Sequence, residues 1–364
     1  MKKKLLFGAA LLFLAAFLLF ALFSGGPAGK AKVSAGPPRF NNGIPVLAQE
    51  QFAYGNGQLE VCMIDVGQGD SILIKTPMDR IILIDTGEYA AKSALTRTLR
   101  KNGIKKIDLL VESHAHTDHM GYMKNIVRDY EIGQILMPRA GSDTPAYEKL
   151  LTAIRKKGLT ITTARAGRRI DLESDLEIEV LGPIDEAPEE LNNSSVILRV
   201  AYGKTSFLFT GDAEQEELSA IMAKTPEKLN ADVLKAAHHG SSGSLPPAFL
   251  EAVSPEYAMI SCGIGNSYGH PHKEALMLLD EAGVLIFRTD RLGNILAVSD
   301  GSTVFFNRTG ERFAVDPSVT VYRTASGKTY HKRDCQVIAA SEISAIRLGE
   351  AREQGLTPCR KCFR

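Results

Sequence analysis

Seven consecutive residues about a third of the way along the chain constrain its fold more than any other segment. They read Ser113-His114-Ala115-His116-Thr117-Asp118-His119 and directly follow the apolar run Leu109-Leu110-Val111. This pattern predicts a buried strand that runs into a helix. Imidazole and carboxylate groups are ligands suited to Zn, Mn or Fe, so their density at this point predicts a metal site. The alternative is a polar, histidine-rich surface loop, and the position between strand and helix favours the metal site.

Short apolar runs alternate with amphipathic stretches on both sides of this segment. Runs rich in Ile, Val and Leu predict strands at residues 59–64, 71–75, 80–84, 109–112, 176–181, 195–200, 206–209, 233–237, 257–261 and 285–287. Helical spacing predicts helices at residues 91–102, 120–130, 214–223 and 273–282. Two groups of strands interleaved with helices are typical of an α/β domain with two sheets.

The histidine-rich segment resembles the metal site of the metallo-β-lactamase fold hydrolases, and the resemblance spans residues 59–307. Leu83-Ile84-Asp85-Thr86-Gly87 resembles the early Asp-x-Gly segment of that family. Leu208-Phe209-Thr210-Gly211-Asp212 resembles the segment with the bridging carboxylate, and His238-His239-Gly240-Ser241 resembles the late histidine segment. The resemblance implies an αββα sandwich fold. The metal ligands that it implies are His114, His116, Asp118, His119, Asp212 and His238.

The same resemblance implies a second set of roles. The residues expected to act in the reaction are Asp118, His119, His239 and His270. Asp85 is expected to orient the metal-site histidines through hydrogen bonds. Asp70, at the end of the turn Gly67-Gln68-Gly69-Asp70, either supports a ligand or closes a hairpin. The implied cofactor is one or two Zn ions, with Mn as the alternative.

One segment departs from the family pattern. Asn192-Asn193-Ser194-Ser195 stands where many members of the superfamily have a metal histidine. Either one ion binds weakly as a result, or His270 or His239 completes its coordination. The number of ions therefore stays open at this point.

Three further segments resemble the hydrolase domain of ComEC-type competence proteins and their stand-alone exported relatives. They lie at residues 64–71, 238–242 and 266–271. The resemblance implies a phosphodiesterase or DNase that uses metal-activated water, with DNA as its substrate. A phosphorylcholine esterase or a β-lactamase on the same fold is one alternative. A non-catalytic DNA-binding or uptake accessory is another, although the intact acidic and histidine ligands argue against it.

The first residues predict export. Lys2, Lys3 and Lys4 precede residues 5–23, which carry no charge, as in a signal peptide or a membrane anchor. With these lysines inside, the rest of the chain is extracellular or anchored on the outer face of the cytoplasmic membrane. Residues 24–51 are rich in Gly, Pro and Ala and predict a linker. The hydrolase domain is expected at residues 52–315.

Residues 316–364 are expected to form a second, small module with soft metal ligands. The spacing of His331, Cys335, Cys359 and Cys362 matches a tetrahedral structural zinc site. A disulfide between Cys359 and Cys362 is the alternative in an oxidising compartment, and zinc is favoured. The segment resembles the Ada-type metal-binding modules, which also occur on exported nucleases. The formal net charge of the whole chain is +1, so contact with DNA must come from local basic patches.

Overall fold

The computed structural model of the chain describes residues 39–41, 44–313, 318–359 and 361–362. The predicted signal or anchor segment at 1–23, the first part of the linker and the domain boundary at 315–316 lie outside these residues. Each helix in the described ranges is too short or too polar to cross a membrane. The domain limits therefore stay predictions.

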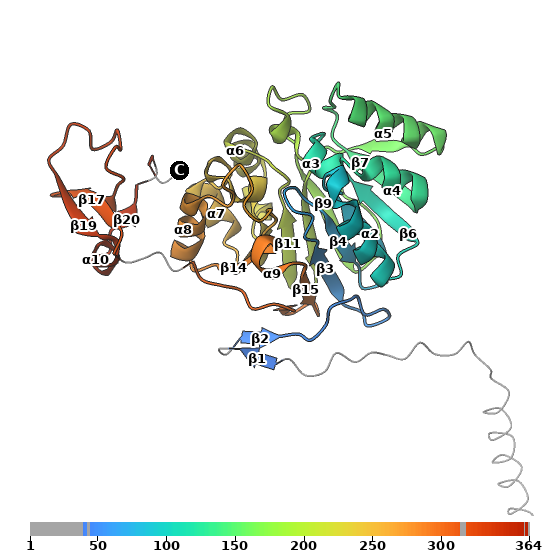
Figure 1. The fold of residues 1–364 in the computed structure, drawn as a ribbon, viewed down its shortest axis with the longest axis horizontal. Helices are drawn as coiled ribbons and strands as arrows, with labels where there is room; N and C mark the ends of the chain where they lie inside the picture. The colour runs from blue at the N-terminus through green and yellow to red at the C-terminus, as the bar shows by residue number, and fades with distance from the viewer. Residues whose placement is uncertain (1–38, 42–43, 314–317, 360, 363–364) are drawn as a thin grey trace, which may run out of the picture. The chain divides into compact units, whose positions relative to one another are not determined.

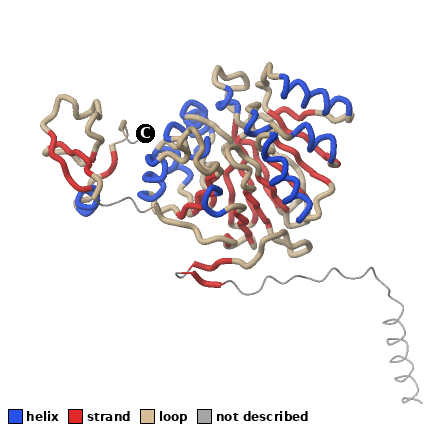
Figure 2. Tube along the Cα trace, in the orientation of Figure 1, coloured by secondary structure: helices blue, strands red, loops and turns tan. Residues whose placement is uncertain are grey.

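Two large β-sheets pack against each other, and helices cover the outer face of each one (Figures 1 and 2). The first sheet has ten strands, in the order β1 (Arg39–Asn41), β2 (Ile44–Val46), β16 (Val304–Phe306), β15 (Ile295–Ser299), β3 (Leu59–Met63), β4 (Ile72–Lys75), β5 (Ile81–Ile84), β6 (Lys106–Val111), β7 (Glu131–Met137) and β8 (Ile161–Thr163). The second sheet has six, in the order β14 (Leu285–Arg288), β13 (Tyr257–Ile260), β12 (Val233–Lys235), β11 (Thr205–Phe209), β10 (Ile197–Tyr202) and β9 (Leu176–Gly182).

Each sheet contains a parallel part that matters for the site. Strands β5 to β8 run parallel to one another in the first sheet. Strands β11 to β14 do so in the second sheet. The carboxyl ends of neighbouring parallel strands meet at the same edge, so the loops that follow them lie close together.

The helices fall into two groups, one for each sheet (Figure 1). The first sheet is covered by α2 (Lys92–Lys101), α3 (Thr117–Met120), α4 (Met123–Asp129) and α5 (Pro145–Lys156). The second sheet is covered by α6 (Gln215–Lys224), α7 (Pro247–Val253) and α8 (Lys273–Glu281). The remaining helical turns are α9 (Thr289–Leu292), η1 (Tyr89–Ala91), η2 (Leu191–Ser194), η3 (Pro226–Lys228), η4 (Ala237–Gly240) and η5 (Ser242–Ser244).

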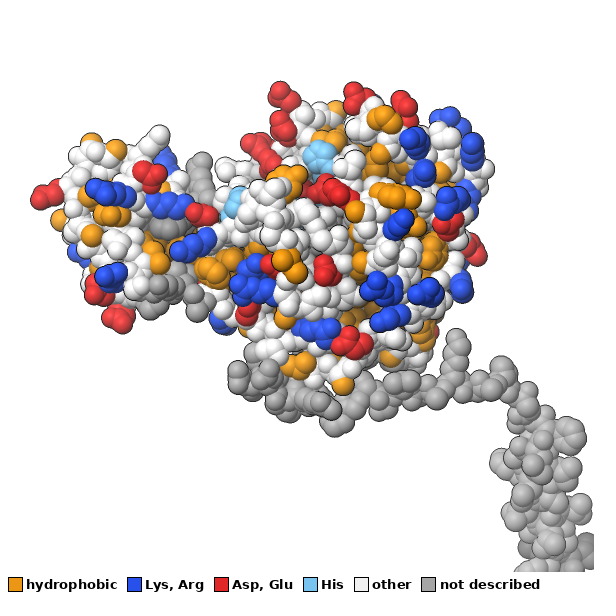
Figure 3. Space-filling view, in the orientation of Figure 1, with side chains coloured by type: hydrophobic (Ala, Val, Ile, Leu, Met, Phe, Trp, Pro, Cys, Tyr) orange, Lys and Arg blue, Asp and Glu red, His pale blue; other side chains and the backbone are white. Residues whose placement is uncertain are grey.

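Charged side chains of both signs share the surface. On the face shown in Figure 3, Lys and Arg side chains are interspersed with Asp and Glu. Several form exposed ion pairs, such as Arg128 with Asp129 and Arg291 with Glu311. This face therefore shows mixed charge and not one continuous basic field, as the small net charge leads one to expect.

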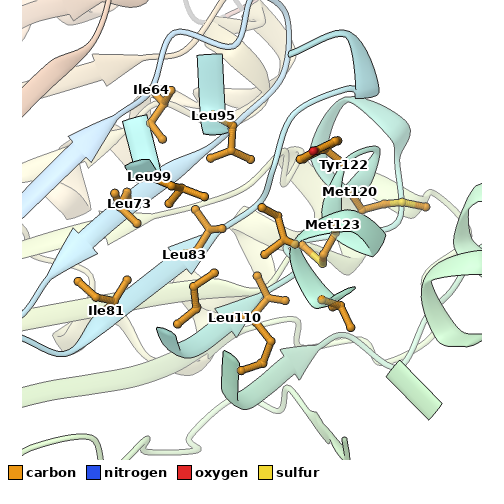
Figure 4. Close-up of a cluster of buried hydrophobic side chains, with 14 of the residues drawn as sticks. Ile64, Leu73, Ile81, Leu83, Leu95, Leu99, Leu110, Met120, Tyr122 and Met123 are labelled. Atoms are coloured by element: carbon orange, nitrogen blue, oxygen red, sulfur yellow. The ribbon is translucent and has the colours of Figure 1, made fainter. Parts of the chain in front are cut away.

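Alternating side chains of the central strands enter two different cores, because successive residues of a strand point to opposite faces. In β4, Leu73 belongs to the cluster under the helices, whereas Ile72 and Ile74 belong to the cluster between the sheets. Figure 4 shows the first cluster, in which Leu95 and Leu99 of α2 lie near Leu73. A third cluster joins the second sheet to α6, α7 and α8. The four layers confirm the predicted αββα sandwich.

The predicted helix at 120–130 is interrupted in the structure. Helix α3 ends at Met120, and α4 begins at Met123. Between them, Gly121 packs so closely on its neighbours that an added Cβ would lie 2.5 Å from the carbonyl oxygen of Thr117. The last residues of the histidine-rich segment therefore lie in the short helix α3 and not in the longer helix α4.

The C-terminal residues form two small sheets of their own. Strand β17 (Thr320–Thr324) pairs antiparallel with β19 (Ile343–Arg347), and β18 (Thr329–Tyr330) pairs parallel with β20 (Thr357–Pro358). Helix α10 (Leu348–Glu353) follows β19 directly. The cluster of buried side chains here is small and includes Cys335 and Cys359, so a metal would add stability that a core of this size lacks.

Candidate metal centre

Loops after four strands meet at one edge of the sandwich. Asp85 follows β5, the histidine-rich segment follows β6, Asp212 follows β11, and the pair His238-His239 follows β12. Asp85, His238 and His239 have positive φ angles of 57°, 47° and 56°. Such angles are costly for residues other than glycine, and they concentrate at functional sites.

Four side chains bring their ligand atoms together at this edge. They are Asp118, His119, Asp212 and His239, and these atoms all lie within 4.8 Å of one another. The Nε2 atoms of His119 and His239 lie 3.1 Å and 3.2 Å from Oδ2 of Asp212. Nε2 of His239 also lies 3.4 Å from Oδ2 of Asp118. We call these four residues the central group.

Hydrogen bonds on the far side of each ring fix the two imidazoles of the central group. Nδ1 of His119 donates to the Asp85 carboxylate at 2.8 Å, and Nδ1 of His239 donates to the carbonyl of Ser261 at 3.0 Å. Each Nε2 atom then faces the centre of the group, where it is buried close to the Asp212 carboxylate but makes no hydrogen bond of good geometry. Two such imidazole nitrogens beside two carboxylates form a donor set that fits a divalent metal ion.

The electrostatics of the central group favour positive charge at its centre. Burial opposes the charged form of His119, but Asp212 and Asp85 outweigh it and raise the pKa of His119 well above its usual value. The pKa of His239 is raised in the same way, against burial, by Asp212 and Asp118. Burial would raise the pKa of Asp212, yet His119 and His239 hold it well below the usual range. A cation at this point would meet the same attraction.

A buried lysine stands behind the central group. The Nζ atom of Lys235 lies 2.5 Å from Oδ2 of Asp70 and 3.4 Å from Oδ1 of Asp212. Burial opposes the charge of Lys235, but Asp70 and Asp212 outweigh it and raise its pKa. In turn, Lys235 overcomes the effect of burial on Asp70 and lowers the pKa of that carboxyl to about 2. Lys235 is not among the predicted site residues, although a charged side chain within the apolar run Val233-Leu234-Lys235-Ala236-Ala237 is a signal that could have indicated it.

His114 and His116 lie beside the central group and contact each other. Nε2 of His114 lies 3.0 Å from Nδ1 of His116, and burial together with the charge of His119 keeps the pKa of His114 well below its usual value. On the other side of the ring, Nδ1 of His114 lies 3.5 Å from Oγ of Ser195. Among the described residues, neither His114 nor His116 belongs to a group of three or more ligands that could hold a metal.

At the late histidine pair, the structure brings His239 into the central group, and the predicted ligand His238 lies beside it. His239 was expected as a residue of the reaction or as a completing ligand. Nε2 of His238 lies 3.9 Å from Oδ2 of Asp212, and its Nδ1 atom lies 3.3 Å from Glu214. Because both histidines have left-handed backbone angles, the alternation of strand β12 does not extend to them. The sequence pattern therefore gives no basis for choosing the ring that turns inward.

A cleft with a volume of about 290 Å³ opens at the central group. Side chains from outside the group also line it, among them Gln68, Tyr268 and His270. Burial and the charge of His239 lower the pKa of His270 to about 4. The turn that carries Gln68 packs tightly on the histidine-rich segment 113–119, which we call the metal loop, since a Cβ added to Gly69 would lie 2.0 Å from the carbonyl oxygen of Asp118.

The sequence matches a known family over most of this domain. The family model described as "Metallo-beta-lactamase superfamily" matches residues 64–264, which is more than half of the chain. The chain belongs to the metallo-beta-lactamase superfamily. The resemblance inferred from the histidine-rich segment is thereby confirmed.

Relatives of this chain include proteins with competence and recombination in their names. It is 36% identical to ComE operon protein 3 of Bacillus subtilis over 65% of this chain and 32% of that protein. It is 31% identical to competence protein ComA of Neisseria gonorrhoeae over 66% of this chain and 32% of that protein. It is also 31% identical to recombination protein 2 of Haemophilus influenzae, over 58% and 25% of the two chains. The matched region thus spans about a third or less of each relative.

The C-terminal residues of this chain present a second donor set. The ligand atoms of His331, Cys335, Cys359 and Cys362 lie within 4.8 Å of one another. Sγ of Cys335 lies 3.3 Å from Nδ1 of His331 and 3.9 Å from Sγ of Cys359. Cys359 and Cys362 are both free. The burial of Cys359 is outweighed by backbone hydrogen bonds from Lys361 and Cys362, which lower its pKa and favour the thiolate that zinc binds.

Proposed function

We propose that this member of the metallo-beta-lactamase superfamily is a metal-dependent phosphodiesterase that hydrolyses DNA. The observation that carries the proposal is the pair of buried Nε2 atoms of His119 and His239, which make no hydrogen bond of good geometry and converge with Asp118 and Asp212 at the mouth of a cleft. A structure that leaves two buried imidazole nitrogens without a good hydrogen bond loses stability unless a ligand satisfies them. Zn fits this donor set, and Mn is the alternative.

Each residue near the cleft has a separate task in this proposal. Asp118, His119, Asp212 and His239 would hold the cation. When bound, a divalent cation at such a site lowers the pKa of water and polarises a phosphoryl oxygen. Asp85 and the Ser261 carbonyl accept from the two Nδ1 atoms, so each Nε2 atom can give up its proton and bind the cation. Lys235 offsets the negative charge of Asp70 and Asp212, so the carboxylates stay ionised without repelling each other.

The names of the relatives support DNA as the substrate. One is a competence protein and another a recombination protein, and both terms concern the handling of DNA. A phosphorylcholine ester would present the same phosphodiester to the cleft, and a β-lactam would present an amide to it. A DNA-binding accessory without turnover is the alternative of another class.

A substrate panel separates these alternatives. The purified full chain is incubated with single- and double-stranded DNA, a phosphorylcholine ester and a β-lactam, in Mn or Zn, with and without a chelator. We expect hydrolysis of DNA, its loss with the chelator, and its loss in Asp118→Ala. Asp129→Asn, which removes an exposed carboxylate paired with Arg128, serves as the matched control and keeps activity. Turnover of the other esters or of the β-lactam without DNA hydrolysis would refute the proposal, as would DNA binding without hydrolysis.

We propose that His331, Cys335, Cys359 and Cys362 hold one structural zinc ion. Four protein ligands would close the coordination shell and leave no position for water or a substrate. The site would then stabilise a module with a small core and would contribute contact with DNA but no chemistry. The support is the donor set and the free state of the cysteines.

We further propose that the enzyme works outside the cytoplasmic membrane, either secreted or anchored. The support is the pattern of three lysines followed by residues 5–23, which lie outside the described residues. Reporter fusions after residue 51 should be active only on the outer side. Fusions that are active only in the cytoplasm would refute this placement.

A further inference from the structure

An exposed tyrosine forms part of the wall of the catalytic cleft. The loop at residues 261–272 connects β13 to α8 and carries Ile264 and Tyr268, which are 84% and 64% exposed. Tyr268 lines the same cleft as Asp118, Asp212 and His239. Tyr268 therefore presents an aromatic ring to the same cleft as the candidate metal ligands, where it can contact a bound ligand.

Hydrogen bonds within the loop hold Tyr268 in place. The amide nitrogen of Asn266 donates to the carbonyls of Gly263 at 2.9 Å and His270 at 2.6 Å, and its oxygen accepts from the His270 N–H at 2.9 Å. Nδ1 of His272 accepts from the backbone N–H of Ser242 at 3.0 Å. Its Nε2 atom therefore carries the proton and donates to the Tyr268 carbonyl at 3.1 Å. These bonds hold the backbone at Tyr268 in place while its side chain stays exposed.

The ring of Tyr268 is also supported from one side. It stacks on His270, with ring centroids 5.6 Å apart and an angle of 21° between the planes. No second ring contact involves Tyr268 in the part of the chain that the structure describes. One face of the phenol is therefore supported, and the other can receive a planar group.

We infer that Tyr268 is a stacking platform for the nucleobase next to the phosphodiester in the cleft. This inference rests on the proposed function. A base can offer its face to an aromatic ring only when it is unstacked from its neighbours, so the preferred substrate is single-stranded DNA or a frayed end. Stacking on one aromatic side chain contributes about tenfold or more in affinity and tolerates any base.

The same ring favours a base over a choline group. Proteins hold quaternary ammonium groups in cages built from several aromatic faces. Tyr268 contributes the one phenol or phenyl ring among the described residues that line this cleft, and the chain has no Trp. A single supported ring suits a flat partner better than a spherical cation.

The test uses oligonucleotides in which single bases are removed. The full chain binds a fluorescent, single-stranded phosphorothioate oligonucleotide, which resists hydrolysis, and Kd is measured by anisotropy for a series with one abasic residue at each position. We expect one abasic position to weaken binding about tenfold in the wild type. Tyr268→Ala should weaken binding of the intact oligonucleotide by a similar factor. In this variant, an abasic residue at any position should leave Kd unchanged. Tyr268→Phe should bind as the wild type does, because the ring makes the contact.

The matched control is Tyr89→Ala, since Tyr89 is 56% exposed and does not line the cleft. It should leave Kd and the abasic profile unchanged. Equal Kd values for the wild type and Tyr268→Ala, or an abasic penalty that persists in Tyr268→Ala, would overturn the inference. A loss in Tyr268→Phe as large as in Tyr268→Ala would do so too, because it would assign the contact to the hydroxyl. Binding with the expected abasic profile but without hydrolysis of ordinary DNA would refute the proposed function and leave the stacking platform standing.

Discussion

The Nζ atom of Lys235 lies 2.5 Å from Oδ2 of Asp70, and both side chains are buried. Asp70 also lies 3.5 Å from Nδ1 of His239, so the ion pair stands directly behind one side of the central group. Removing one partner of a buried ion pair leaves an uncompensated charge, which costs more than the pair itself contributes. The pair therefore links the stability of the fold to the order of the metal site.

Lys235→Met should lower the free energy of unfolding by about 3–5 kcal/mol, because it leaves Asp70 buried without its partner. The double variant Lys235→Met/Asp70→Asn should recover part of this loss, since it removes both charges. Denaturant unfolding of the wild type and the two variants measures the difference. A loss below about 1 kcal/mol in the single variant would show that water or another cation replaces Lys235.

Gly69→Ala should disturb the metal loop, because the new Cβ would lie 2.0 Å from the carbonyl oxygen of Asp118. We expect a loss of stability of about 2–4 kcal/mol and weaker metal binding. Gly67→Ala is the matched control, since Gly67 also has a positive φ but has no atom within 4 Å of an added Cβ. It should cost only about 1–2 kcal/mol of backbone strain and keep the metal affinity. Equal metal affinity in the two variants would argue against the tight packing of this turn on the metal loop.

Glu217 should make the protein less stable as the pH rises. Burial raises the pKa of Glu217 to about 7, against hydrogen bonds from the backbone of Ile184 and Asp185. Between pH 4.5 and 7, the unfolded chain ionises this group while the folded chain keeps the proton, so stability falls with increasing pH. Glu217→Gln should therefore stabilise the protein by about 3 kcal/mol at pH 8 and by almost nothing at pH 4.

The exposed Glu251 of α7 offers the control for this comparison. Glu251→Gln should leave the free energy of unfolding unchanged at both pH values. Thermal or denaturant unfolding at pH 4 and pH 8 measures the change in the free energy of unfolding for each variant relative to the wild type. A stabilisation by Glu217→Gln that is the same at both pH values would assign the effect to packing and not to titration.

Cys359→Ser should remove one zinc ion and leave hydrolysis of a small phosphodiester intact. Cys359 belongs to the C-terminal donor set, which would have no open position for chemistry. DNA binding should weaken and its salt dependence should flatten, if basic side chains near this module contact phosphates. The control is Cys62→Ala, which removes a buried thiol of β3 and should keep all the zinc. Full zinc content in Cys359→Ser would refute the C-terminal site, and lost turnover of the small ester would refute the separation of roles.

Sequence patterns predicted the parts of the fold in which periodicity is strong. The strands β3, β4, β5 and β9 and the helices α2, α6 and α8 lie within one or two residues of their predicted limits. Elements such as β7 and α5 were not predicted. Strand β7 leaves three of its first four residues exposed, so its first half gives no apolar run. Helix α5 has Tyr147, Leu150 and Ile154 at helical spacing, a signal that could have indicated it. Apolar periodicity alone does not reveal a strand such as β7, whose first half is mostly exposed.

Some residues of the site could be predicted from the sequence, and others could not. The segment with Asp118 and His119 lies at the centre of the site because strand β6 ends just before it. The choice between His238 and His239 depends on two left-handed backbone angles, which no pattern of side chains reveals. Lys235 contacts Asp70 from another sheet, and such a contact depends on tertiary packing that a single sequence does not encode locally.

The most direct test of the central group is to compare the metal content and the DNA hydrolysis of His239→Ala and His238→Ala. Nε2 of His239 lies 3.2 Å from Oδ2 of Asp212, whereas Nε2 of His238 lies 3.9 Å from the same oxygen. We expect His239→Ala to lower the affinity for Zn or Mn at the hydrolase site by more than about 100-fold and to abolish DNA hydrolysis, with the fold intact by circular dichroism. His238→Ala should keep its metal. Full metal content and activity in His239→Ala, or loss of the metal in His238→Ala alone, would contradict the assignment.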